Sequence, residues 1–172
     1  NKAFNNKKIL ITGHTGFKGS WLTIWLKLYG ANILGISKNI PTSPSLFKIL
    51  NVGKKVNNKF FDIKDLKKLK KIINKFKPDY IFHLAAQALV KNSYIDPIET
   101  INSNTIGTAN ILEALRNTKR KCNVILITSD KSYKNLELDR GYNEMDILGG
   151  KDPYSGSKAA AEMIIHSYLS SY

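Results

Sequence analysis

The chain has 172 residues, of which 42% are hydrophobic and 23% charged, a composition typical of a globular domain able to bury one core. The best candidate for a membrane span, Ser20–Leu28, is too short and carries a lysine, and the polar, basic first residues show no secretory signal. The single cysteine, Cys122, excludes an internal disulfide and is typical of a reducing compartment. We therefore expect a cytoplasmic protein with one domain spanning residues 1–172.

The net charge of +14 raises the question of a polyanionic partner, such as a nucleic acid or an anionic membrane. Nearly all of this charge is lysine, whereas proteins that read phosphates and bases favour arginine. In the densest run, Lys64–Lys77, apolar residues recur at helical spacing, so that the lysines form the solvated face of an amphipathic helix. The apolar stripe comprises Leu66, Leu69, Ile72, Ile73 and Phe76. We therefore expect neither a nucleic-acid nor a membrane partner.

Short apolar runs of β type alternate with helical patterns along the whole chain, which predicts a doubly wound parallel sheet with helices on both faces. The expected strands are Lys8–Thr12, Asn32–Ser37, Lys59–Phe61, Tyr80–Ala85 and Asn123–Thr128. The expected helices are Ser20–Tyr29, Lys64–Lys77, Pro97–Asn117 and Pro153–Tyr172, with a short helical turn around Leu46–Leu50 and a long polar loop over Ser129–Asp152. Such a sheet normally continues beyond a fifth strand, so we expect an N-terminal fragment.

Three glycines, Gly13, Gly16 and Gly19, lie between the first strand and the first helix. In such a turn the first glycine permits the bend, the second lets the backbone approach a pyrophosphate, and the third allows the helix to pack closely on the strand. The helix N-terminus then offers free N–H groups to the anion. We expect His14 to line this dinucleotide site, and we leave open whether Lys18 meets phosphate or solvent.

The residues that follow the second strand normally read the adenosine ribose. A carboxylate there selects the 2′-hydroxyl of NAD, and a cation accepts the 2′-phosphate of NADP. Because Ser37, Lys38 and Asn39 include no carboxylate, the sequence does not exclude NADP. Asp62, at the end of the third strand, is suited either to receive the adenine amino group or to cap the following helix.

Tyr154 and Lys158 are four residues apart and share one face of the last helix. A nearby ammonium favours the ionised phenol, which can then act as a base. Ser129, Asp130 and Lys131 follow the fifth strand, at the carboxyl edge where ligands bind in such sheets. There a hydroxyl can hold a sugar, a protonated carboxyl can donate a proton, and a neutral amine can accept one; a simple Ser/Asp turn is the alternative.

Several segments resemble the CDP-glucose 4,6-dehydratases, which belong to the extended short-chain dehydrogenases. The segments are TGHTGFKGSW (12–21), PTSPSLF (41–47), HLAAQALV (83–90), TSDKSY (128–133) and DPYSGSK (152–158). The resemblance covers essentially the whole chain but only the first half of that family's length. It implies a Rossmann-type doubly wound sheet, bound NAD and no metal, a homodimer formed through the long helix and the Tyr154 helix, and a place in deoxysugar, surface polysaccharide and lipopolysaccharide biosynthesis.

The resemblance also implies a redox-neutral elimination on CDP-glucose. Tyr154 takes the 4-hydroxyl proton while hydride passes from C4 to NAD; Lys131 then removes the C5 proton, and Asp130 protonates the leaving C6 hydroxyl. Hydride returns to C6 and leaves CDP-4-keto-6-deoxyglucose. The expected catalytic residues are Ser129, Asp130, Lys131, Tyr154 and Lys158. The expected cofactor-binding residues are Gly13, His14, Gly16, Phe17, Gly19, Asn39, Asp62, Ile63, Leu84, Ala85, Ala86, Gln87, Asn104, Tyr154 and Lys158.

Two alternatives remain open at this stage. The family often has Asp where Asn39 stands, which weakens the preference for NAD over NADP. A related epimerase or reductase acting on another nucleotide sugar is the nearest rival function. We expect the isolated 172 residues to be inactive, because the sugar-nucleotide-binding half is absent.

Overall fold

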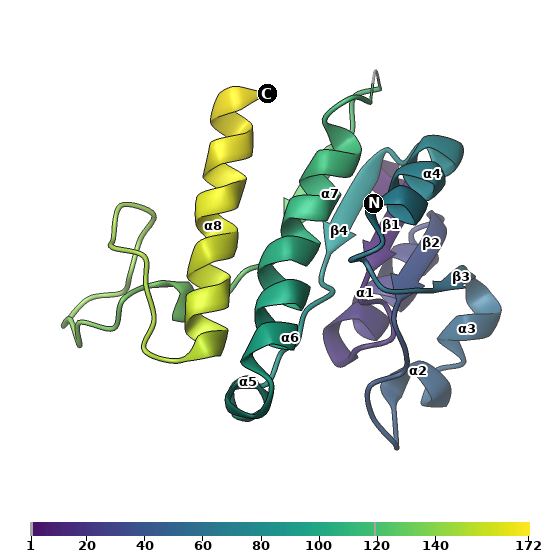
Figure 1. Cartoon of the computed structure of the whole chain (residues 1–172). Coiled ribbons are helices and arrows are strands. Elements are labelled where there is room, and N and C mark those ends of the chain that lie inside the picture. Colours follow the sequence, from purple (N-terminus) through teal and green to yellow (C-terminus); the bar gives the residue numbers. More distant parts are fainter. Residues whose placement is uncertain (1, 119) are drawn as a thin grey trace. The chain divides into compact units, whose positions relative to one another are not determined.

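A computed structural model describes residues 2–118 and 120–172 (Figure 1). The chain forms two compact units. Unit 1 consists of Asn1–Ala85 and Glu113–Ile127, and unit 2 consists of Ala86–Leu112 and Thr128–Tyr172.

Unit 1 contains a parallel sheet of five strands in the order β3-β2-β1-β4-β5. The strands are β1 (Lys8–Thr12), β2 (Asn32–Ser37), β3 (Asn57–Phe60), β4 (Tyr80–His83) and β5 (Asn123–Leu126). The chain runs outward from β1 to β3 and then returns to the other side of β1, so that the strand order reverses between β1 and β4. This confirms the doubly wound parallel sheet predicted from the sequence and places a ligand-binding switch point at the carboxyl ends of β1 and β4.

Helices cover the sheet of unit 1 on both faces. They are α1 (Phe17–Leu28) and α4 (Leu66–Phe76), whereas the short helices α2 (Leu46–Ile49) and α3 (Val52–Lys55) pack against α1, and a 3₁₀ turn at Lys2–Phe4 precedes β1. Right-handed crossovers put α1 and α4 on opposite faces. Leu26 of α1 packs on Ile9 and Ile33, while Leu69 and Ile73 of α4 are fully buried.

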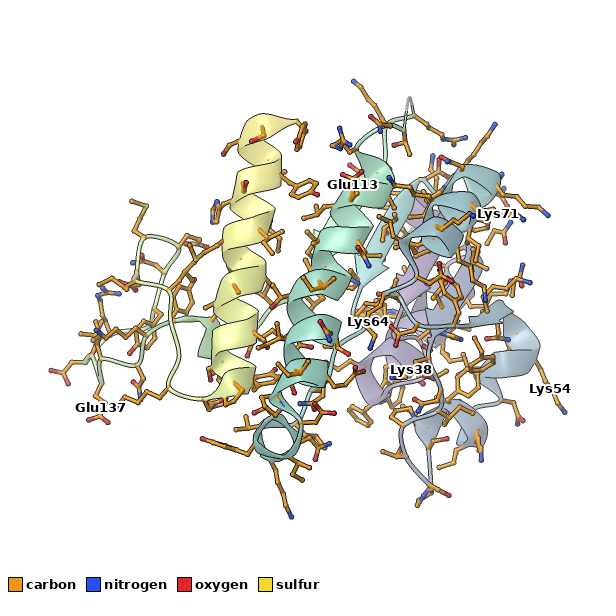
Figure 2. The ribbon with its side chains drawn as sticks, in the orientation of Figure 1. Lys38, Lys54, Lys64, Lys71, Glu113 and Glu137 are labelled. Atoms are coloured by element: carbon orange, nitrogen blue, oxygen red, sulfur yellow. The ribbon has the colours of Figure 1, made fainter. Side chains whose placement is uncertain are left out.

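Helix α4 is amphipathic, with apolar residues buried on one face and lysines on the other, as the sequence predicted. Asp65 caps its first turn by accepting a hydrogen bond from the Lys68 amide, and Lys77 ends it in the left-handed conformation just before Pro78. Its lysines are exposed or half-buried around the outer face, as the side chain of Lys71 in Figure 2 illustrates. The charge run therefore forms a solvated helix face, as predicted.

Unit 2 is built around two long helical segments. The first comprises α6 (Pro97–Ile101), a π-helical turn η2 (Asn102–Ile106) and α7 (Gly107–Leu115), and is preceded by α5 (Val90–Ile95). The second is α8 (Pro153–Ser171), which packs against α5, α6, η2 and the 3₁₀ turn η3 (Asp130–Ser132). No helix in the described part of the chain is both long and apolar enough to cross a membrane.

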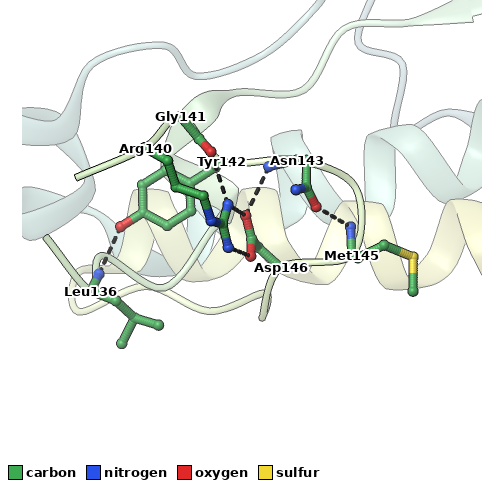
Figure 3. A network of polar contacts seen from close by, with 7 residues as sticks. All are labelled: Leu136, Arg140, Gly141, Tyr142, Asn143, Met145 and Asp146. Carbon is green, nitrogen blue, oxygen red and sulfur yellow. Dashed lines mark hydrogen bonds and ion pairs between the residues drawn. The ribbon is translucent and has the colours of Figure 1, made fainter. Parts of the chain in front are cut away.

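The segment between η3 and α8 was predicted as a polar loop, and it is a loop with internal order (Figure 3). Arg140 makes a two-pronged ion pair with Asp146, at 2.8 and 2.6 Å. That guanidinium, helped by the Asn143 amide, lowers the pKa of Asp146 to about 2. The ring of Tyr142 stacks on Tyr133 at 5.5 Å, so the loop is held by side chains rather than by regular structure.

Three strand boundaries differ from the prediction. Strand β4 ends at His83 and β5 at Leu126, each two residues earlier than expected, and β3 begins two residues and ends one residue earlier than expected. The Leu84 amide donates to the Thr12 carbonyl and the Ile127 amide to the His83 carbonyl, so that a backbone hydrogen bond is still made just beyond each of these two strands. The apolar composition continues past the ends of both strands and does not mark where the strands stop.

Candidate functional site

The glycine turn after β1 is held by backbone hydrogen bonds. Gly13 adopts a φ of +75°, its amide donates to Ile36 at 2.7 Å, and its carbonyl accepts from Gly16 at 3.1 Å. A Cβ on Gly13 would lie 2.7 Å from the Ala85 amide nitrogen, and a Cβ on Gly19 would overlap the Gly13 carbonyl oxygen. Two of the three glycines are thus required by the packing of the turn itself.

Gly16 is different, because the protein's own packing does not require it. A Cβ there would meet only the Gly13 carbonyl oxygen, at the ordinary contact distance of 3.4 Å. Gly16 is also the N-cap of α1 and makes no side-chain capping bond. The turn therefore leaves room for a small group at Gly16, beside helix N–H groups that no side chain caps, which is the arrangement that a pyrophosphate needs.

The imidazole of His14 does not line this turn, contrary to our expectation. The ring is fully buried, with Nδ1 hydrogen-bonded to the Ser37 hydroxyl and Nε2 to the Asn58 side chain, both at 2.9 Å. Burial lowers the pKa of His14, although its hydrogen bonds oppose this effect. With no exposed surface and both nitrogens engaged, the ring joins the turn to β2 and β3 and has no free group for a ligand.

The end of β2 carries a cation that is paired with Asp62. The Lys38 and Lys64 ammonium groups each lie 3.4 Å from an Asp62 carboxylate oxygen, and both lysines are labelled in Figure 2. Asp62 also accepts a hydrogen bond from the Lys64 amide. The alternative that Asp62 caps the next helix is wrong, because Asp65 is the cap. Asn39 is exposed, and its carbonyl accepts from the Thr15 hydroxyl at 2.7 Å.

The end of β4 lies directly beside the glycine turn. The Leu84 and Ala85 amides donate to the carbonyl and the hydroxyl of Thr12, at 3.1 and 3.2 Å. Two further residues of unit 1, Phe17 and Ile63, were also expected to contact the cofactor. Phe17 is 71% exposed, whereas Ile63 is buried. Ala85 is thus positioned by the end of β1, at the carboxyl edge of the sheet.

In unit 2, Tyr154 and Lys158 lie in the first two turns of α8 and are both buried. Asp152 caps the helix by accepting hydrogen bonds from the Ser155 amide at 3.0 Å and hydroxyl at 2.6 Å. Burial raises the pKa of Asp152, but these bonds and the nearby Lys131 ammonium outweigh it, so that the net shift is downward. The cap fixes the start of α8 and hence the positions of the phenol and the amine.

Ser129 is the N-cap of η3, and Asp130 and Lys131 are its first two residues; η3 packs on α8. The Ser129 hydroxyl donates to the Asp130 carboxylate at 3.0 Å and accepts from the Lys131 amide at 3.2 Å. Asp130 and Lys131 are exposed. The structure therefore shows the Ser/Asp turn that we considered as the alternative, and the Ser129 hydroxyl takes part in that turn.

Asn104 sits inside the π-helical turn η2 and is almost fully buried. Its side-chain oxygen accepts from the Gln87 amide at 2.8 Å, and its amide nitrogen donates to the Gln87 carbonyl and the Ser157 hydroxyl. The neighbouring Thr105 hydroxyl donates to the Ser157 carbonyl at 2.9 Å. Asn104 therefore holds the Ala86–Gln87 segment to α8, which is a positioning role, and π-helical turns recur at such places.

The expected site residues are thus divided between the two units. The glycine turn, Asn39, Asp62, Ile63, Leu84 and Ala85 belong to unit 1, whereas Ala86, Gln87, Asn104, Ser129–Lys131, Tyr154 and Lys158 belong to unit 2. Three residues that the sequence did not single out hold the two sets in place. They are Asn58 in unit 1, and Asp152 and Ser157 in unit 2. Only Asp152, directly before a helical Pro, carried a recognisable capping signal.

Comparison with known proteins gives consistent results. The profile of a family described as GDP-mannose 4,6 dehydratase matches residues 10–172. A CDP-glucose 4,6-dehydratase from Salmonella typhimurium is 44% identical over 169 residues, which cover 98% of this chain and 47% of that protein. Among solved structures, the UDP-glucose 4-epimerase of Thermotoga maritima with UDP-glucose matches with a TM-score of 0.84 and 26% identity, over 96% of this chain and 52% of that one. The NAD complex of the UDP-glucose 4-epimerase of Thermus thermophilus matches with a TM-score of 0.82 and 29% identity, over 96% and 51%. The chain therefore spans about half the length of the relatives that it matches.

Proposed function

Because this chain belongs to the GDP-mannose 4,6-dehydratase family, we propose that it is the NAD-binding part of an enzyme that converts CDP-glucose to CDP-4-keto-6-deoxyglucose. The observation that carries the choice of substrate is the 44% identity to a CDP-glucose 4,6-dehydratase over nearly the whole chain. The enzyme is accordingly a lyase that eliminates water from the sugar.

The glycine turn supports the binding of NAD. Gly16, where a Cβ would meet the Gly13 carbonyl oxygen only at 3.4 Å, and the N-terminus of α1, which has no side-chain cap, are suited to receive the pyrophosphate. The Lys38–Asp62 pair lies next to the position at which the ribose is read, and Lys38 supplies a cation that also tolerates a 2′-phosphate. NAD is the proposed cofactor, and NADP is a weaker alternative.

Bound NAD supplies a reversible acceptor for two electrons, which makes the net elimination of water redox-neutral. The Tyr154 phenolate accepts the proton of the sugar 4-hydroxyl. Lys158, one turn further along α8, stabilises that phenolate with its ammonium and holds the cofactor ribose. Both side chains are buried, which strengthens their mutual electrostatic interaction.

The elimination itself is assigned to the η3 turn. Once C4 is a ketone, the C5 proton is acidic; we assign its removal to Lys131, and to Asp130 the protonation of the departing C6 oxygen, which leaves as water. Ser129 holds the sugar by a hydrogen bond. The Ser129–Asp130 bond supports this assignment, because it orients the carboxyl group before the sugar arrives.

A nucleotide-sugar 4-epimerase is the second candidate, since the solved structures that match the fold include such enzymes. The two functions are separated by incubating the complete protein with CDP-glucose and catalytic NAD and following the sugar by NMR. A new C6 methyl group with a C4 ketone supports the dehydratase. Inversion at C4 with the C6 hydroxyl retained would establish the epimerase instead.

The role of Tyr154 can be tested in the same assay. Tyr154→Phe is expected to lower kcat by about 10²–10⁴, the usual contribution of a general base. Tyr168→Phe removes a hydroxyl from the same helix four turns away and serves as the matched control. If both variants turn over at the same rate, Tyr154 is not the base.

The assembly and location of the protein are also part of the proposal. We expect a cytoplasmic homodimer formed through the α6–α7 segment and α8, with a nucleotide sugar as substrate and no nucleic-acid partner. Steeply salt-dependent binding to DNA that survives at moderate salt would contradict the last point. The 172 residues alone are expected to turn over no substrate.

A further inference from the structure

Helix α8 carries a half-buried carboxylate, Glu162, that the proposed reaction does not use. Tyr154, Lys158 and Glu162 follow one another at intervals of four residues, so they lie along one side of the helix. The Glu162 carboxylate accepts a hydrogen bond from the Thr128 hydroxyl at 2.5 Å. Because Thr128 directly precedes Ser129, this bond joins the helix of the proposed base to the segment to which the elimination is assigned.

The residues Ser129–Lys131, which we call the elimination turn, are fixed at both ends. At the C-terminal end, the amide and the hydroxyl of Ser132 both donate to the Ser129 carbonyl, at 3.0 and 2.7 Å. Ser132 is buried, and η3 packs on α8. At the N-terminal end, the bond between Thr128 and Glu162 links the chain to α8. The turn is thus attached to α8 on both sides, and Glu162 supplies one of the two attachments.

The charge of Glu162 also acts on the far end of η3. Burial, followed by the carboxylates of Glu144 and Glu162, raises the pKa of the Tyr133 phenol. Tyr133 is the C-cap residue of η3, so Glu162 lies close to the whole turn and not only to Thr128. A carboxylate that binds the residue before the turn and influences the residue after it is well placed to fix the turn on α8.

The two steps of the proposed reaction depend on this attachment to different degrees. Oxidation at C4 uses Tyr154 and Lys158, which both belong to α8, and it leaves a 4-ketone and NADH. Elimination then removes the C5 proton and the C6 oxygen as water, and hydride returns from NADH to C6. This second step requires the elimination turn to lie at a set distance from the sugar, and a displacement of about 1 Å costs up to about 10²-fold in rate.

We propose that Glu162 is a positioning residue for the elimination, because its hydrogen bond to Thr128 holds the elimination turn in place on α8. The inference rests on the proposed dehydratase function and adds a residue to it. Glu162 exchanges no proton with the sugar and acts only through Thr128. Loss of the bond should therefore slow the elimination while oxidation at C4 proceeds as before, so that NADH accumulates.

The first test follows the absorbance of NADH while the complete protein turns over CDP-glucose with NAD. Thr128→Val removes the hydroxyl and is expected to slow the elimination at least ~10-fold and to raise the share of cofactor present as NADH in the steady state. Thr118→Val is the matched control, since it removes a half-buried hydroxyl that donates to the Leu115 carbonyl in unit 1, and it should leave that share unchanged. Equal shares of NADH in Thr128→Val and the wild type would overturn the positioning role.

Variants of Glu162 separate the hydrogen bond from the charge. Glu162→Leu is expected to behave as Thr128→Val does, and the double variant should be no slower than either single variant, because both changes remove the same bond. Glu162→Gln keeps an oxygen acceptor without the charge, and Thr128→Ser keeps the hydroxyl, so both should turn over nearly as the wild type does. Additive effects in the double variant, or Glu162→Gln as slow as Glu162→Leu, would overturn the proposal.

A measurement without substrate tests the attachment directly. In the substrate-free complete protein, hydrogen exchange at the Ser132 amide, which donates to Ser129, is expected to be faster in Thr128→Val than in Thr118→Val. Unchanged exchange would overturn the positioning role. If the wild type forms no C6 methyl group from CDP-glucose, the proposed function is wrong and the role in elimination falls with it, whereas normal dehydration by Thr128→Val overturns only the inference about Glu162.

Discussion

Replacing Gly16 by alanine is expected to leave the fold intact and to weaken NAD binding, whereas replacing Gly19 is expected to destabilise the fold itself. Gly16 has φ −73° and ψ 172°, which alanine adopts without strain, and its Cβ would meet only the Gly13 carbonyl oxygen at 3.4 Å. At Gly19 the added carbon would overlap that oxygen and lie 2.8 Å from the Gly13 carbonyl carbon and the His14 Cα. Substitution of Gly16 should therefore change mainly the affinity for NAD, and substitution of Gly19 mainly the stability of the fold.

The magnitudes follow from these contacts. Reducing the freedom of the unfolded chain favours alanine at Gly16 by about 0.4–1 kcal/mol, and the poorer cap offsets part of this, so the net change should be within about 0.5 kcal/mol. Overpacking at Gly19 costs about 1–3 kcal/mol, against which the better helix propensity of alanine returns up to about 1 kcal/mol. For NAD, a methyl group in the open side of the turn should raise the dissociation constant tenfold or more, equivalent to about 1.4 kcal/mol.

Urea denaturation of the full-length protein, with and without saturating NAD, measures both effects at once. Without NAD, the Gly16→Ala midpoint should match the wild type, and that of Gly19→Ala should be lower. NAD at a hundredfold excess over its dissociation constant stabilises the wild type by about 2.7 kcal/mol, and the Gly16 variant should lose about half of that increment or more. If Gly16→Ala binds NAD as tightly as the wild type, the open side of the turn is not the pyrophosphate site.

Three further predictions concern residues around the turn and in unit 2. Burial lowers the pKa of His14, so that just below the ordinary histidine pKa the unfolded state binds more protons than the folded state. The free energy of unfolding should therefore fall as the pH drops below about 6.5, by at most ~1.4 kcal/mol per pH unit. His14→Asn should remove that part of the pH dependence, as measured by urea titrations. Asn104→Ala leaves the Gln87 amide without its acceptor and should cost about 1–3 kcal/mol, with faster hydrogen exchange at that amide; unchanged exchange would contradict the positioning role. Lys38→Asp places a carboxylate beside the expected ribose position and should raise the preference for NAD over NADP at least ~10-fold in calorimetry, whereas Lys54→Asp, the same charge change elsewhere on unit 1, should not.

The elements that could be predicted are those with long-range sequence patterns. Helix α4 is indicated by apolar residues at helical spacing, and β1 and β2 are indicated by short apolar runs that are buried on both faces. Helix α5 was not predicted, because its six residues carry no side-chain cap and its stability comes from packing on α6 and α8. The π-helical turn η2 was also missed, since its signal lies in three-dimensional contacts of Asn104 and not in local composition.

His14 shows most clearly why site residues are harder to predict than strands. A histidine inside a phosphate-binding turn suggests a ligand contact, and nothing in the turn itself indicates that the ring faces inward. The relevant signal lay in the second strand, where Gly35 interrupts an otherwise apolar run. Glycine within a strand often marks the close approach of another group, and here a Cβ on Gly35 would overlap the His14 ring. The ring occupies that space and reaches Ser37 and Asn58, so that one side chain fixes the turn, the end of β2 and the start of β3 together. The geometry of the proposed dinucleotide site thus depends on a residue that has no surface with which to touch the dinucleotide.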